Sequence, residues 1–131
     1  MIGEGQERTE RRDRSVHVVA DADDFPAGTH RVVHVDGREI GVFNVGGEFH
    51  ALPNLCPHQL GPLCTGRVSG TLMARRETDW QRQWVYEGEI ITCPWHGLEY
   101  HISTGQCLAL PEIRLRRYDV WVEEGKVKIR V

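Results

Sequence analysis

Two short segments hold the most specific signals in the chain: NLCPHQLGPLCTG (54–66) and TCPWHGLEYHISTG (92–105). Cys56 and His58 form a C-x-H pair in the first, and Cys93 and His96 form a C-x-x-H pair in the second. Thiolates and imidazoles bind zinc and iron–sulfur centres, so two loops can place two of each around one metal site. Proline after each cysteine favours rigid, tightly turned loops that hold such ligands in place.

The sequence around these segments predicts an antiparallel all-β domain. From Ser15 onwards, short alternating or β-branched runs are separated by glycine turns. A first strand is expected at 15–20, and a loop with one helical turn at 21–28. Hairpin turns are predicted at four dipeptides that readily take positive φ angles: Asp36-Gly37, Gly46-Gly47, Glu87-Gly88 and Glu124-Gly125.

Length and charge set the domain organisation. A chain of 131 residues suits one domain. Residues 1–14 are highly charged and have few large apolar side chains, so a flexible charged tail is expected there, followed by one domain at 15–131. The formal charge of −3, from 16 basic and 19 acidic residues, shows no excess of positive charge that would indicate a nucleic-acid partner.

The expected location is the cytoplasm, without a membrane partner. No stretch approaches the roughly eighteen apolar residues of a membrane span, and no apolar core of a secretion signal is present. In a reducing compartment, some of the four cysteines are expected to bind metal rather than form disulfides.

The spacing of the two pairs alone does not identify the metal. Two cysteines and two histidines also suit tetrahedral zinc, so a zinc-stabilised interaction module is one alternative. A zinc finger usually draws two ligands from a helix or a short knuckle. Here both pairs lie in Gly/Pro loops within a β pattern, which argues against a zinc finger.

The longer strings CPHQLGPL and CPWHGLEY…TG resemble the Rieske ferredoxins and the Rieske domains of ring-hydroxylating oxygenases. The resemblance covers most of the chain from Ser15 onwards. It implies a Rieske-type antiparallel β-sandwich or barrel with a cluster-binding subdomain made of the two loops. It further implies one [2Fe-2S] cluster, with Cys56 and Cys93 on one iron and His58 and His96 on the other.

The resemblance also implies a function in electron transport rather than catalysis, because the chain has no room for the catalytic iron domain of an oxygenase. The leading hypothesis is a ferredoxin that takes one electron from a reductase and gives it to a terminal oxygenase. The alternative within the same family is the small Rieske subunit of a complex resembling nitrite reductase, in which the partner is a larger reductase subunit.

Two departures from the high-potential members bear on the subclass. Quinol-oxidising Rieske proteins join the two loops by a disulfide between positions that are Gly61 and Trp95 here. They also place a serine and a tyrosine, both hydrogen-bond donors to the cluster, at positions that are Leu98 and Tyr100 here. The loss of one donor predicts a lower, ferredoxin-like potential, although Tyr100 can equally be a core residue. Cys64 and Cys107 are expected to be buried thiols.

Residues 71–88 make the gap between the two segments longer than in compact ferredoxins and are interpreted as an insertion. This stretch mixes aromatic and arginine side chains, which are favoured at contact surfaces. It can therefore dock a redox partner, or it can be an extra hairpin whose aromatics pack on the domain. The residues concerned are Trp80, Trp84, Tyr86, Arg75, Arg76 and Arg82.

Overall fold

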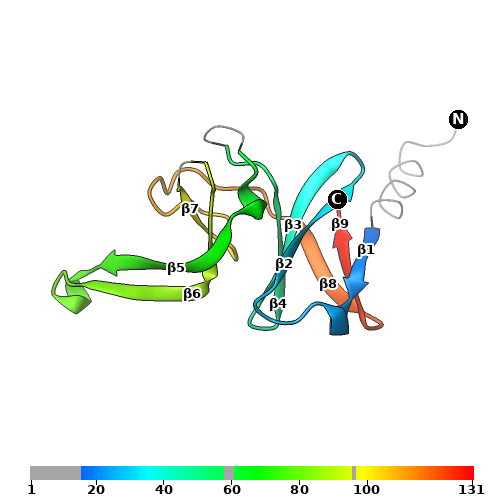
Figure 1. Ribbon diagram of the computed structural model, residues 1–131, viewed down its shortest axis with the longest axis horizontal. Helices are drawn as coiled ribbons and strands as arrows, with labels where there is room; N and C mark the ends of the chain where they lie inside the picture. Colours follow the sequence, from blue (N-terminus) through cyan, green and yellow to red (C-terminus); the bar gives the residue numbers. More distant parts are fainter. Residues whose placement is uncertain (1–15, 58–60, 96) are drawn as a thin grey trace, which may run out of the picture.

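In the computed structural model, which describes residues 16–57, 61–95 and 97–131, the strands form three antiparallel sheets (Figure 1). The first sheet has the order β1 (Val16–Asp21), β9 (Lys126–Arg130) and β8 (Asp119–Glu123). The second is β2 (His30–Val35), β3 (Arg38–Val45) and β4 (Glu48–Pro53). The third is β5 (Arg67–Ala74), β6 (Arg82–Thr92) and β7 (Glu99–His101). Short 3₁₀ turns complete the described elements: η1 (Ala22–Asp24), η2 (Leu63–Thr65) and η3 (Arg76–Thr78).

The expected all-β class is confirmed, and so are three of the four predicted hairpin turns. Asp36-Gly37 joins β2 to β3, Gly46-Gly47 joins β3 to β4, and Glu124-Gly125 joins β8 to β9. All six of these residues have positive φ angles, as tight two-residue hairpins require.

The first two sheets together form the base of the molecule. Their edges meet at a bridge, where the Tyr118 N–H donates to the Ala51 carbonyl at 3.0 Å. Between them lies an apolar core that includes Phe25, Ile40 and Ile129, each at most 1% exposed. Alternation along the strands puts these side chains on the inner faces.

The fourth predicted hairpin turn, Glu87-Gly88, is wrong. Gly88 has the expected positive φ of 81°, but β6 continues past it because β5 pairs with both halves of β6. Ile90 lies opposite Ser69 and Val85 lies opposite Thr71, so residues 86–89 form a bulge opposite Gly70.

The actual turn between β5 and β6 lies around η3, where Asp79 and Trp80 both have positive φ angles. This turn was missed because residues 75–81 contain no glycine or proline to mark it. The resulting long hairpin extends away from the base (Figure 1).

The second loop is shorter than the segment 92–105 that the sequence predicted, because a strand forms within that segment. Glu99–His101 forms β7, which pairs with β6 through Tyr100 opposite Ile91. The connection between β6 and β7 is therefore residues 93–98, called here the second loop. The first loop is residues 54–66, between β4 and β5. In the part of the chain that the structure describes, no helix is both long and apolar enough to span a bilayer.

Candidate metal centre

Strand pairing brings the two loops to the same end of the third sheet. Thr92, directly before the second loop, pairs with Glu99, directly after it, and with Arg67, which directly follows the first loop. The first loop ends at Gly66, where a Cβ atom would overlap the carbonyl oxygen of Thr92. Glycine therefore permits the two backbones to approach this closely.

Both loops are closed by the same kind of backbone hydrogen bond. The Cys56 N–H donates to the Gly61 carbonyl at 2.7 Å, and the Cys93 N–H donates to the Leu98 carbonyl at 2.8 Å. In each case the acceptor lies five residues after the cysteine. His58 and His96 fall between these partners in the sequence but lie outside the described residues, so the structure places two of the four predicted ligands.

The two described ligands are buried in one apolar cluster. Cys56 is 2% exposed and Cys93 is 1% exposed, and both belong to the core cluster that contains Leu63, Ile91 and Tyr100. A Cβ atom at Gly61 of the first loop would lie 3.3 Å from Sγ of Cys93 in the second. The arrangement thus holds two sulfur donors from different loops in a water-poor environment, as a thiolate-ligated cluster needs.

Tyr100 connects the second half of the site to the first. Its hydroxyl lies 3.3 Å from Sγ of Cys56, and the residue is fully buried. Burial, and next the hydrogen bond with Cys56, raises the pKa of the Tyr100 hydroxyl, so it keeps its proton at neutral pH. A metal-bound thiolate has no proton, so Tyr100 is then the donor. Tyr100 is therefore both a core residue and a hydrogen-bond donor to a predicted ligand.

Gly61 and Trp95, the positions of the disulfide in quinol-oxidising members, are in contact here. A Cβ atom at Gly61 would lie 2.9 Å from Cδ2 of the Trp95 ring. The ring therefore packs directly against the glycine, while Trp95 remains 57% exposed. A non-covalent contact joins the loops where those relatives have a covalent bond.

The other two cysteines are buried thiols, as expected. Cys107 is 0% exposed and Cys64 is 1% exposed. Burial raises the pKa of the Cys64 thiol to about 12, partly offset by a hydrogen bond from the Gly41 backbone. Sγ of Cys64 lies 3.4 Å from the Pro53 carbonyl oxygen. Because the thiolate is the form that binds metal, the raised pKa makes Cys64 a poor metal ligand.

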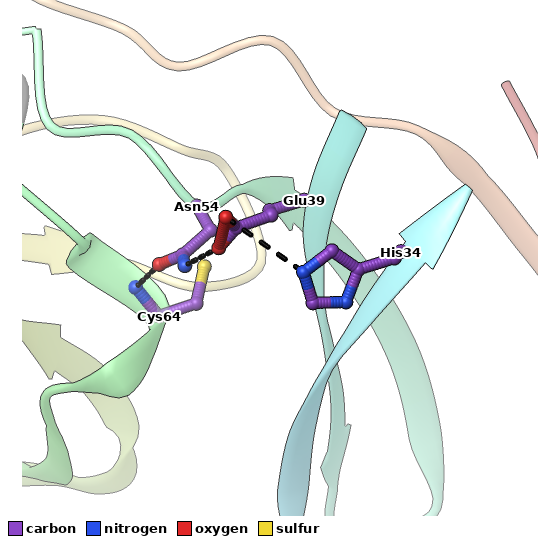
Figure 2. Close-up of polar contacts among 4 residues, drawn as sticks. All are labelled: His34, Glu39, Asn54 and Cys64. Atoms are coloured by element: carbon purple, nitrogen blue, oxygen red, sulfur yellow. Dashed lines mark hydrogen bonds and ion pairs between the residues drawn. The ribbon is translucent and has the colours of Figure 1, made fainter. Parts of the chain in front are cut away.

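Sequence reasoning missed two residues that support the first loop, Asn54 and Glu39. Figure 2 shows the Asn54 side chain between Glu39 of β3 and the backbone of Cys64. The available signal was an asparagine at the start of a loop, a residue type that often bonds nearby backbone. Glu39 gave no signal, because its partner lies 15 residues away in the sequence.

The aromatic residues of the 71–88 stretch have mixed environments. Trp80 is 68% exposed and Trp84 is 56% exposed. Trp84 Nε1 nevertheless donates to Glu87 at 2.5 Å, and Tyr86 makes an edge contact with His101 at 4.6 Å between ring centroids. Tyr86 thus packs on the sheet, while Trp80 is presented to solvent. The docking function of this stretch stays a prediction.

The antiparallel β fold brings two loops together, and each loop carries one buried cysteine, an arrangement that is compatible with an iron–sulfur site held by two loops. The family model for the Rieske [2Fe-2S] domain matches residues 15–119, so the chain belongs to the Rieske [2Fe-2S] domain family. Its cofactor is accordingly one Rieske-type [2Fe-2S] cluster.

Two relatives differ in how much of their own length this chain covers. The chain is 33% identical over 108 residues to mouse apoptosis-inducing factor 3, covering 82% of this chain but only 15% of that protein. It is 29% identical over 110 residues to the ferredoxin component of the naphthalene 1,2-dioxygenase/salicylate 5-hydroxylase systems of Ralstonia sp., covering 83% of this chain and 88% of the relative. The chain therefore spans a small part of the first relative and most of the second.

A solved structure is similar in fold along nearly the whole chain. It is a complex of reduced oxygenase and oxidised ferredoxin in carbazole 1,9a-dioxygenase. The similarity has a TM-score of 0.68 at 26% identity, and it covers 89% of this chain and 94% of the matched chain.

Proposed function

We propose that this protein is the ferredoxin component of a multicomponent oxygenase system, carrying one electron from a reductase to a terminal oxygenase. The observation that carries the proposal is the match along 88% of the Ralstonia ferredoxin component, combined with two buried cysteines in facing loops. The solved complex of an oxygenase with its ferredoxin supports the choice of an oxygenase as partner. On this proposal the protein is an electron carrier and not itself an enzyme.

The proposed cluster ligands are Cys56 and Cys93 on one iron and His58 and His96 on the other. When bound, the [2Fe-2S] cluster accepts and releases a single electron. The chain's own contribution is to bury both thiols, to close each loop on its own backbone, and to offer the Tyr100 hydroxyl to Cys56. Rigid, dry surroundings reduce the rearrangement that accompanies a change of charge.

The proposed domain organisation is a charged tail at 1–14 and a Rieske domain at 15–131, with an insertion at 71–88. The family match to residues 15–119 supports the start of the domain. We also propose a cytoplasmic location. The buried thiols of Cys64 and Cys107 support it, because a reducing compartment keeps cysteines out of disulfides.

Voltammetry of the anaerobically purified protein tests the proposal. A reversible one-electron wave near the low end of the Rieske range, about −150 mV, is expected. A wave several hundred millivolts higher would contradict the ferredoxin assignment and favour quinol chemistry. Absence of a wave from fully metallated protein would favour a zinc module.

A second experiment separates the two electron-carrier hypotheses. The reduced protein is mixed with a Rieske-type terminal oxygenase, and reoxidation is followed by visible absorbance. Reoxidation that saturates with oxygenase concentration is expected. Copurification of this chain with a large reductase subunit, together with no transfer to the oxygenase, would favour the nitrite-reductase-like complex.

A further inference from the structure

The first loop connects two parts of the molecule, and a residue near each of its ends contacts β3. It leaves the base at Pro53, which pairs with Ile40 of β3, and it ends at the start of β5 in the third sheet. The loop is therefore the segment through which the predicted ligand Cys56 is attached to the base.

Asn54 lies at the start of this loop and makes three hydrogen bonds that hold the loop in place. Its backbone N–H donates to the Glu39 carbonyl at 2.9 Å, and its Nδ2 donates to Oε1 of Glu39 at 3.0 Å. Its Oδ1 accepts the backbone N–H of Cys64, near the other end of the loop, at 2.6 Å. The Asn54 side chain is only slightly exposed, at 7% for the residue, so water competes poorly for these bonds.

The Cys64 end of the loop also packs against β3. A Cβ atom at Gly41 would overlap Cβ and Sγ of Cys64, so the cysteine lies directly on the glycine backbone. Glu39 and Gly41 are two residues apart on the same strand, and each contacts one end of the loop. Both ends are thus held to one short segment of β3, with the Asn54 side chain joining them (Figure 2).

We propose that Asn54 is a positioning residue for the cluster: its side chain fixes the first loop to β3 and so sets the position of Cys56 relative to the second loop. The inference rests on the proposed ligand set. Asparagine suits this position because it offers one acceptor to the Cys64 N–H and one donor to the Glu39 carboxylate. An aspartate would keep the acceptor but place a second carboxylate against Glu39.

His34 is a minor part of this network. Its Nε2 lies 3.8 Å from Oε2 of Glu39, and the imidazole is 76% exposed. An exposed pair at this distance contributes little, so His34→Ala serves as a control that is expected to change nothing.

The test compares Asn54→Asp with the charge-conserving pair Asn54→Asp/Glu39→Gln in the cluster-loaded full chain. In the pair, the amide introduced at position 39 donates to the carboxylate introduced at position 54, which restores the bond with donor and acceptor exchanged. Three readouts are used: iron release to a chelator, the EPR line shape of the reduced protein, and hydrogen exchange in the peptide that covers residues 54–66.

Asn44→Asp is the matched control for general loss of stability. Asn44 is also 7% exposed and on β3, and its Nδ2 donates to the Phe25 carbonyl at 2.8 Å in the base. This variant removes a comparable buried hydrogen bond away from the loops. It is expected to lower the melting temperature while leaving the EPR line shape and the rate of iron release unchanged.

Asn54→Asp is expected to release iron about tenfold faster than wild type, the factor that corresponds to one lost buried hydrogen bond. Its EPR line shape should change, and hydrogen exchange in the loop should become faster. The double variant Asn54→Asp/Glu39→Gln should return all three readouts toward wild type.

Iron release equal to that of Asn44→Asp, with an unchanged line shape, would overturn the inference alone. A wild-type chain that binds no cluster would overturn the proposed function as well. If Asn54→Asp does not fold, the pair decides: wild-type release supports the inference, and tenfold faster release overturns it.

Discussion

The first and second loops close in the same way, each with a cysteine N–H bonded to the carbonyl five residues on, but they are attached to the molecule differently. The second loop starts and ends in the third sheet, between strands that pair through Thr92 and Glu99. The first loop starts in the base and ends in the third sheet. Its ends are held by the Asn54 side chain and by packing of Cys64 on Gly41.

This difference shows how the two halves of one site can tolerate mutation unequally. A backbone ladder survives most substitutions, because every residue except proline supplies the same N–H and C=O groups. Hydrogen bonds made by one side chain, such as those of Asn54, are lost when that single residue is replaced. We therefore expect substitutions that remove supporting side chains to loosen the first loop far more than the second.

The largest effect is expected when a proposed ligand is removed from either loop. The two loops should then behave alike. Cys56→Ser and Cys93→Ser are both expected to lose the cluster and with it much of the stability, because metal binding and folding are coupled. Iron content and visible absorbance measure this. Cys107→Ala is the control and should keep full iron content, since this buried thiol lies outside both loops and is not among the proposed ligands. Full iron content in either serine variant would contradict the proposed ligand set.

The next effect concerns the contact that joins the two loops. Gly61→Ala places a methyl group 2.9 Å from the Trp95 ring and 3.3 Å from Sγ of Cys93. Such overpacking typically costs about 1–3 kcal/mol, which denaturant unfolding of the loaded protein will show. Removing the ring in Gly61→Ala/Trp95→Ala should recover most of that loss. An equal loss in the double variant would mean that the methyl group acts on Cys93 or the backbone instead.

Much of the fold was predictable because local chemistry decides it. Asp36-Gly37 and Glu124-Gly125 take positive φ angles in tight turns regardless of what surrounds them, and the sequence identifies both. Glu87-Gly88 has the same composition as the second of these, but its glycine serves a bulge. That outcome depends on β5 pairing along both halves of β6, which is a long-range contact that a dipeptide cannot encode.

The candidate site divides in the same way. The cysteine–histidine spacing predicts Cys56 and Cys93 as ligands, and the structure buries both in the same part of the apolar core. The asparagine at the start of the first loop gave a weak signal, but its partners were not predictable, because Glu39 and Cys64 lie 15 and 10 residues from Asn54 in the sequence. Tyr100 was identified by resemblance, but only the structure shows that its hydroxyl reaches Cys56 of the first loop.

A smaller effect is predicted for this contact between β7 and the first loop. Tyr100→Phe removes the hydroxyl that lies 3.3 Å from Sγ of Cys56. A hydrogen bond to a sulfur ligand favours the reduced, more negative state, so its loss should lower the reduction potential. About 60 mV is expected, the one-electron equivalent of about 1.4 kcal/mol. Voltammetry at constant pH measures it, with Tyr118→Phe in the base as control. A shift in both variants would show that the hydroxyl of Tyr100 has no specific role.

The smallest effect tests whether the second loop is held by the backbone pairing of the two strands that flank it, β6 and β7. Thr71 of β5 is 6% exposed and donates to Oε1 of Glu99, at the end of that loop, at 2.8 Å. Thr71→Val removes this bond and should cost about 1 kcal/mol of unfolding free energy. Because β6 and β7 remain paired, iron release should change less than about twofold, far below the effect expected for Asn54→Asp. If Thr71→Val releases iron as fast as Asn54→Asp, the second loop also depends on side chains, and the strand ladder alone does not explain its stability.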